Sequence, residues 1–120
     1  MNKQWWQTVE HYFQAQKFLD PDHREKIRTS YSAKQAAELG RSRAIPIRKD
    51  WENVKDQIMF DAVLKKFQTH KELAQLLIST GKEAIVENAP GDYYWGAGKD
   101  GTGLNKLGHI LEEVRAKITI

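Results

Sequence analysis

The chain has 120 residues, of which 40% are hydrophobic and 29% are charged, and its formal net charge is +3. This length suits one modest core, so we expect residues 1–120 to form a single domain. The absence of cysteine excludes disulfides, thiol catalysis and zinc–thiolate sites. The small positive charge suits an anionic ligand, but it is too dispersed to favour a nucleic-acid-binding protein.

Apolar runs and the N-terminus bear on location. No apolar run approaches the roughly 18 residues that a membrane-spanning helix needs. The first residues, MNKQWWQ, lack the apolar stretch of a signal peptide. We therefore expect no membrane partner and a cytoplasmic location. Trp5 and Trp6 must either pack on the domain or contact a partner, and an oligomer formed through this end is one of these two alternatives.

The first predicted helix begins after Thr8, a good N-cap residue, and runs to about Leu19. At about 100° per residue, Gln14 lies about 40° from Glu10, and Lys17 lies about 20° away on the other side. The three polar groups therefore share one face. A carboxylate and an ammonium held together on a mostly buried helix can shift each other's pKa. The alternative interpretation is an exposed polar stripe.

Short elements alternate with helix breakers in the next part of the chain. Pro21 ends the first helix because proline cannot continue the hydrogen-bond ladder. Ser30 and Ser32 can each cap the following helix. The expected elements are a helical turn at 23–28, a helix at 33–43 and an extended segment at 44–48. A basic cluster there could bind phosphate or form a solvated face; it consists of Arg41, Arg43, Arg48 and Lys49.

The second half is also mostly helical. Asp50 is expected to cap the longest helix, and Gly81 has the position of a C′ glycine. The predicted fold class is mainly α, a compact single domain with at most a small β element. The predicted elements are helices at 51–68, 71–80 and 105–118, a short β-like run at 84–86, and a loop at 88–103.

Glycines concentrate before the last predicted helix. Five of the eight glycines fall between Gly91 and Gly103, where a loop turns sharply or approaches a ligand closely. Asp92 precedes three aromatic residues, whose faces can stack on bases or sugars. The loop leads into a helix N-terminus, whose free N–H groups favour phosphate. The alternative interpretation is an exposed turn with a buried tryptophan.

Three other kinds of site are rejected. The letters G-x-G-x-x-G occur at 96–101, but a dinucleotide site needs a strand just before the motif, and here a loop precedes it and no second strand can follow. The four histidines have no metal-ligand spacing, so we expect no metal and no cofactor. No nucleophile elbow of a serine hydrolase is present.

Four stretches together resemble a known family: TVEHYFQAQKF, LGRSRAIPIRKDWENVK, LLISTGKEAIVENAPGDYYWGAG and GLNKLGHILEEVR. In order and spacing they are similar to the YbiA-like proteins of the NADAR superfamily, over nearly all of residues 6–118. The resemblance implies an orthogonal helical bundle and hydrolysis of N-glycosidic bonds in phosphoribosyl or ADP-ribosyl compounds. Relatives usually have an additional N-terminal segment, which we expect this chain to lack.

The implied substrates are riboflavin intermediates of the phosphoribosylaminouracil type or ADP-ribosylated guanine. Nucleic acid would enter only as an ADP-ribosylated substrate. The family's EHYFQAQK block implies that Glu10 and Lys17 are catalytic, and Asp92 is a candidate second carboxylate. The candidate substrate-binding residues are Gln14, Arg48, Trp51, Tyr94, Trp95, Gly96, Gly98 and Asn105.

Two mechanisms fit these residues. In one, Glu10 and Asp92 act as the paired carboxylates of a glycosidase. In the other, which we favour, Lys17 attacks the aldehyde-level carbon of a ring-opened sugar and Glu10 moves the protons. The alternative function is a non-catalytic module that binds ADP-ribose or a related nucleotide. A basic nucleic-acid-binding domain is a third interpretation, and it predicts salt-dependent affinity.

Overall fold

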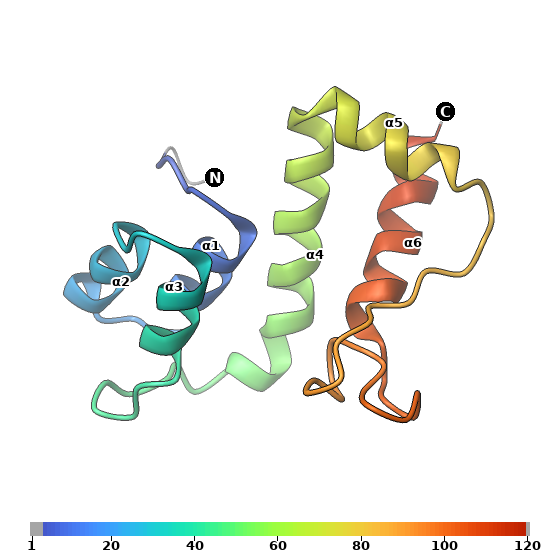
Figure 1. The fold of residues 1–120 in the computed structure, drawn as a ribbon. Coiled ribbons are helices and arrows are strands. Elements are labelled where there is room, and N and C mark those ends of the chain that lie inside the picture. Colours follow the sequence, from blue (N-terminus) through green and yellow to red (C-terminus); the bar gives the residue numbers. More distant parts are fainter. Residues whose placement is uncertain (1–3, 120) are drawn as a thin grey trace. The chain divides into compact units, whose positions relative to one another are not determined.

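The computed structural model describes residues 4–119, and helices dominate this part of the chain (Figure 1). The chain divides into two compact units, Met1–Ala62 and Val63–Ile120. The single domain stays a prediction. The predicted mainly α class is confirmed, with one isolated antiparallel bridge between Phe18 and Ile47 in residues 4–119. The six helices found there are α1 Val9–Gln16, α2 Pro21–Arg28, α3 Ala33–Gly40, α4 Trp51–Thr69, α5 Lys71–Ser79 and α6 Lys106–Ile118.

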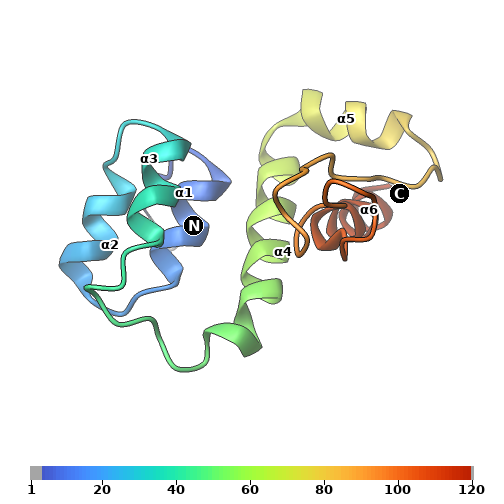
Figure 2. The ribbon, with the colours of Figure 1, turned by 60° about the horizontal axis from the view of Figure 1, so that its bottom comes forward.

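In the first unit, α1, α2 and α3 pack on one another (Figure 2). Each begins at a polar N-cap whose side chain accepts the backbone N–H three residues on, which satisfies one free donor of the first turn. The caps are Thr8 and Ser32, both predicted, and Asp20. The core between the helices consists of Ala15, Phe18, Ile27 and Ala36.

Helix α1 is shorter than predicted. It ends at Gln16, and Phe18 pairs with Ile47 instead of continuing the helix. The Lys17 carbonyl accepts the Arg48 N–H at 3.0 Å, which extends this pairing. The end of α1 is thus set by a segment far along the chain, although Lys17 keeps right-handed helical backbone angles.

The neighbouring boundaries also differ from the prediction. Pro21 begins α2 instead of only ending α1, because proline at the first helical position gives up an N–H that would lack a helical partner. Helix α3 stops at Gly40, three residues early. Ser30 is not a cap, since its hydroxyl donates to the Ile27 carbonyl at 2.7 Å.

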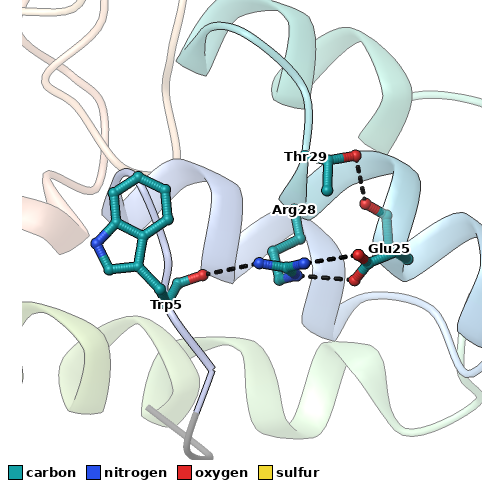
Figure 3. Close-up of polar contacts among 4 residues, drawn as sticks. All are labelled: Trp5, Glu25, Arg28 and Thr29. Atoms are coloured by element: carbon teal, nitrogen blue, oxygen red, sulfur yellow. Dashed lines mark hydrogen bonds and ion pairs between the residues drawn. The ribbon is translucent and has the colours of Figure 1, made fainter.

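The N-terminal segment is tied to α2 (Figure 3). The Trp5 carbonyl accepts from Arg28 Nη1 at 3.4 Å, and Arg28 also binds both carboxylate oxygens of Glu25. Trp6 packs edge-on against Tyr12, with ring centroids 5.3 Å apart. The Trp5 side chain is 70% exposed, so the two tryptophans differ: one packs on its unit and the other faces solvent.

In the second unit, α5 packs on α6. Helix α5 is followed by Gly81 with φ of 65°, the predicted C′ conformation. The predicted β-like run at 84–86 is wrong, because these residues have no strand structure. Side chains from α6 and its cap bond this backbone instead: Glu112 Oε2 accepts the Ile85 N–H at 2.9 Å, and Asn105 Nδ2 donates to the Ile85 carbonyl at 2.8 Å.

Candidate functional site

The predicted polar face of α1 is present. Gln14 Nε2 donates to Glu10 Oε1 at 2.7 Å, as neighbours four residues apart on a helix can do. Lys17 lies one turn further on and bonds outside the helix: its Nζ donates to the Gly40 carbonyl at 3.0 Å. The amide and the amine therefore both meet the end of α3, and the carboxylate is bonded to the amide. The exposed-stripe alternative fails for Lys17, which is half-buried.

The surroundings of Lys17 disfavour its charged form. Burial lowers the pKa of the Lys17 amine, and the positive charge of Arg43 lowers it further. Glu10 opposes this with its negative charge, while Arg41 and Lys55 add to the lowering. More of the Lys17 amine is therefore neutral, and able to act as a nucleophile, than of an ordinary lysine.

Gly40 also belongs to this site, although no functional role was predicted for it. A Cβ at Gly40 would overlap the side-chain amide of Gln14, whose Cδ would lie 2.6 Å away. The absence of a side chain lets the end of α3 lie against α1 and present its carbonyl to Lys17. The sequence signal that could have identified Gly40 is a glycine inside a helical pattern, where alanine would make the helix more stable.

Arg48 and Trp51, both predicted to bind substrate, are engaged inside their own unit. The Arg48 guanidinium binds both oxygens of Asp50, at 2.6 and 2.9 Å. This ion pair also uses the carboxylate that was predicted to cap α4. Trp51 is 6% exposed, and its ring lies 5.0 Å from that of Phe13. The roles of Arg48 and Trp51 in substrate binding stay predictions. Of the basic cluster, Arg41 and Arg43 lower the pKa of Lys17.

Asp92 organises the turn that carries the aromatic residues of the second unit. Its Oδ1 accepts the backbone N–H of Tyr94 at 3.0 Å and that of Trp95 at 2.8 Å. This is the local turn that aspartate side chains favour. The rings of Tyr94 and Trp95 meet edge-on, with centroids 4.8 Å apart, and Lys106 Nζ lies 5.7 Å from the centre of the Tyr94 ring.

Packing within the segment explains two of its glycines. A Cβ at Gly96 would lie 2.8 Å from that of Ala89. Gly98 has φ of 75°, and a Cβ there would overlap the Tyr93 ring. Both positions therefore need glycine for the chain's own packing, whether or not a ligand approaches.

Asn105 and the start of α6 are also bonded within the unit. The Asn105 side chain donates to the Ile85 carbonyl and accepts the Glu87 N–H, each at 2.8 Å. The N–H groups of Lys106 and Leu107 donate to carbonyls of the preceding loop, at 3.0 and 2.9 Å. The expectation of free N–H groups at this helix start is therefore wrong for these two residues.

Metal ligands do not gather in the described chain. Within residues 4–119, no group of three histidine or acidic side chains could hold a metal ion. His11 is buried and bonds Thr8 Oγ1 at 2.7 Å and the Ser30 carbonyl at 3.1 Å. In the same range, no helix is long and apolar enough to cross a membrane.

Comparison with known proteins decides the family. A family model described as the NADAR domain matches residues 1–119. The chain belongs to the NADAR family. An NMR structure of the Escherichia coli protein YbiA superposes with a TM-score of 0.88 at 50% identity, covering 94% of this chain and 67% of that one. The predicted YbiA-like fold is thereby confirmed.

Curated relatives carry enzyme names. "N-glycosidase YbiA" of Shigella boydii is 50% identical over 115 residues, which are 96% of this chain and 72% of the relative. "N-glycosidase Npun_R5314" of Nostoc punctiforme is 47% identical over 117 residues, or 95% and 75% of the two chains. "Riboflavin biosynthesis protein PYRR, chloroplastic" of Zea mays is 40% identical over 123 residues, or 94% of this chain and 20% of the relative. The predicted class, a hydrolase of N-glycosyl bonds, is the class that the first two names state.

Proposed function

We propose that this NADAR protein is an N-glycosidase that releases a base from a phosphoribosyl or ADP-ribosyl group. The observation that carries the proposal is the half-buried Lys17 amine, which bonds the Gly40 carbonyl and whose pKa is lowered by burial and by Arg43. A neutral amine is a good nucleophile toward aldehyde-level carbon. Relatives named N-glycosidases, and one named a riboflavin biosynthesis protein, support the substrate class.

The proposed chemistry begins with a sugar joined to the base through an amino nitrogen. Such a sugar opens to an imine between C1 and that nitrogen. Lys17 Nζ attacks C1, the bond from C1 to the base nitrogen breaks, and the two hydrogens of the amine pass to the departing base. The sugar is now an imine of Lys17. Water then adds to C1, which releases the free aldehyde sugar and restores the amine.

Glu10 is the proton carrier in this scheme. Its carboxylate lies on the same helix face as Lys17, and Gln14 holds one oxygen at 2.7 Å. That bond fixes the carboxylate without neutralising it. Glu10 would accept a proton as Lys17 attacks and return one to the leaving base, the double role that a positioned carboxylate can play.

The rival route pairs Glu10 with Asp92 as two carboxylates around one sugar. The Asp92 side chain already accepts two backbone N–H groups with Oδ1, a role that the amine route leaves undisturbed. Tyr94 and Trp95 are the proposed stacking partners of the base, and Arg48 and Asn105 stay predicted substrate contacts.

The direct test is release of free base, read by mass spectrometry. The substrates are phosphoribosylaminouracil and ADP-ribosylated guanosine, each with wild-type protein, Glu10→Gln and Lys17→Ala. Inosine 5′-phosphate is the matched negative control, because its sugar is joined to a ring nitrogen that cannot form a neutral imine by ring opening. We expect wild type to release base from an amino-linked substrate, and both variants to lose this activity.

A different result would point to the alternative function. If wild type released no base but bound ADP-ribose, and Glu10→Gln bound it equally well, the protein would be a binding module. Equal cleavage of inosine 5′-phosphate would contradict the imine route and favour the two-carboxylate route.

A further inference from the structure

Two basic side chains converge on one carbonyl oxygen at the end of α3. The Gly40 carbonyl accepts from Lys17 Nζ at 3.0 Å and from Arg43 Nη1 at 3.4 Å. Arg43 Nη1 also donates to the Ser42 carbonyl at 3.2 Å, which fixes the guanidinium over this short stretch of backbone. Because both groups bond the same oxygen, the amine and the guanidinium lie side by side.

This arrangement depends on a glycine. The Gln14 amide occupies the space where a Cβ of residue 40 would lie. The same Gln14 side chain donates to Glu10. One close approach between α1 and α3 therefore orients the carboxylate through Gln14 and receives the amine through the Gly40 carbonyl.

We propose that Gly40 and Arg43 are positioning residues for the Lys17 amine: Gly40 supplies the shared acceptor, and Arg43 supplies a permanent positive charge beside it. Arginine stays charged throughout the working pH range, so its neighbour is favoured in the neutral form. The proposal rests on the catalytic role proposed for Lys17 and adds the residues that would make that role available at neutral pH.

Other charged groups also act on Lys17, and they define the controls. Glu10 comes from α1, Arg41 follows α3, and Lys55 comes from α4. Lys55 is paired with Glu52 at 2.7 Å, and Arg41 is exposed. Arg43 makes the largest contribution of any charge, second only to burial. Its removal is therefore the most informative single change.

The test measures Lys17 without substrate. Wild-type protein is pulsed with acetic anhydride, which acylates neutral amines, at a series of pH values. The labelled fraction of the Lys17 peptide is then read by mass spectrometry. We expect Lys17 to label at lower pH than the exposed Lys34 of α3. In Arg43→Gln, the Lys17 profile should move to higher pH, and labelling at neutral pH should fall several-fold.

Three further variants separate the effect of the Arg43 charge from the effect of the packing at Gly40. Arg43→Lys keeps a cation and should keep the Lys17 profile close to wild type. Lys34→Gln removes an exposed cation from α3 and should leave the profile unchanged. Gly40→Ala should also move Lys17 toward ordinary lysine behaviour, and circular dichroism checks that this variant is folded; if it is not, the Arg43 series decides alone.

An unchanged Lys17 profile in Arg43→Gln would overturn the proposal, and so would an equal shift in Lys34→Gln. The outcome is independent of turnover. A shifted profile in a protein that releases no base would support the positioning roles while contradicting the proposed function. An unshifted Lys17 profile in Arg43→Gln, together with base release by the wild-type enzyme, would contradict the positioning roles while supporting the proposed function.

Discussion

The end of α1 and the glycine-rich segment contain similar residue types, but they use their polar side chains differently. At the end of α1, Gln14 bonds Glu10, and Lys17 bonds a neutral carbonyl in a half-buried position. In the glycine-rich segment, Asp92 and Asn105 bond backbone groups of their own unit. The first region holds a half-buried amine on a neutral carbonyl, and the second stabilises a turn.

This difference distinguishes a region suited to catalysis, the end of α1, from a region that stabilises the fold, the glycine-rich segment. A charged group that burial and like charges push toward neutrality costs stability, and such groups gather at functional sites. A carboxylate or amide that completes a turn repays its burial through the bonds it makes. We therefore expect substitutions at the end of α1 to act on turnover, and substitutions in the glycine-rich segment to act first on stability.

The largest effect is expected from Lys17→Ala. Loss of the nucleophile should lower kcat by more than about 10⁴-fold, by analogy with other enzymes that lose theirs. Lys17→Arg is the control, because it keeps a positive charge but cannot form the imine. Steady-state base release measures both. Substantial activity in either variant would contradict a covalent role for this residue.

Glu10→Gln should have the second-largest effect on kcat. A positioned proton carrier contributes about 10²–10⁴-fold, so kcat should fall within this range while the fold is retained. The glutamine can still bond Gln14, which keeps the helix face intact. Thermal unfolding of the variant should match wild type within a degree or two, and a large loss of Tm would show that Glu10 is structural instead.

Glycine-to-alanine substitutions measure how far side-chain packing requires glycine in the glycine-rich segment. Gly98→Ala forces a Cβ into the Tyr93 ring at a left-handed φ, so we expect a loss of about 2–4 kcal/mol in unfolding free energy. Gly101→Ala has a similar φ of 80° but open space around it, so only about 1–2 kcal/mol should be lost. Urea denaturation compares the two.

Gly91→Ala is the matched control for this pair. Its φ is not left-handed and a Cβ would meet no atom within 4 Å, so its stability should be close to wild type. Equal losses in Gly98→Ala and Gly101→Ala, with none in Gly91→Ala, would mean that the left-handed backbone, and not the contact with Tyr93, requires glycine at these positions.

Asp92 is both a turn residue of the glycine-rich segment and a candidate catalytic carboxylate, so its variants test both roles. Asp92→Asn keeps an oxygen that can accept from Tyr94 and Trp95, so the amine route predicts less than about a tenfold loss of kcat, far below the effect of a lost catalytic group. Asp92→Ala should lose about 1–3 kcal/mol of stability, because two N–H groups lose their acceptor. A loss in Asp92→Asn equal to that in Glu10→Gln would favour the two-carboxylate route.

The smallest expected effect is on the pH dependence of folding stability. The pKa of Lys17 is lower in the folded state than its ordinary 10.5, so between these two values the unfolded chain binds more protons. Folding stability should therefore rise with pH across this window. Lys17→Met should remove that slope and raise Tm slightly at neutral pH. A lower Tm in Lys17→Met would show that its hydrogen bond to Gly40 outweighs the cost of its charge.

Local signals predicted much of the fold. Thr8, Ser32 and Gly81 have side chains or backbone freedom that mark helix ends, and the structure confirms all three. The end of α1 was not predictable, because the bridge from Phe18 to Ile47 depends on a distant segment.

The predicted β-like run at 84–86 failed for a related reason. Its residue types favour strands, but α6 and its cap bond its backbone with side chains. Local propensity cannot reveal such a partner.

The candidate site was predictable to a similar degree. Helical periodicity placed Glu10, Gln14 and Lys17 on one face, because this spacing is a local property. Gly40 required knowledge of how α1 and α3 approach each other, which no local pattern contains. Asp92 was predicted as a catalytic carboxylate and Asn105 as a substrate contact implied by the family resemblance, and the structure adds their bonds to the backbone.

Borohydride trapping tests the central claim most directly, namely that the Lys17 amine forms an imine with the sugar. Wild-type protein is mixed with phosphoribosylaminouracil and sodium borohydride, and the products are mapped by peptide mass spectrometry, with Lys17→Arg as the control. The proposed chemistry predicts a reduced sugar adduct on Lys17 in wild type and none in the variant. Base release under turnover conditions with no adduct on Lys17 would contradict it.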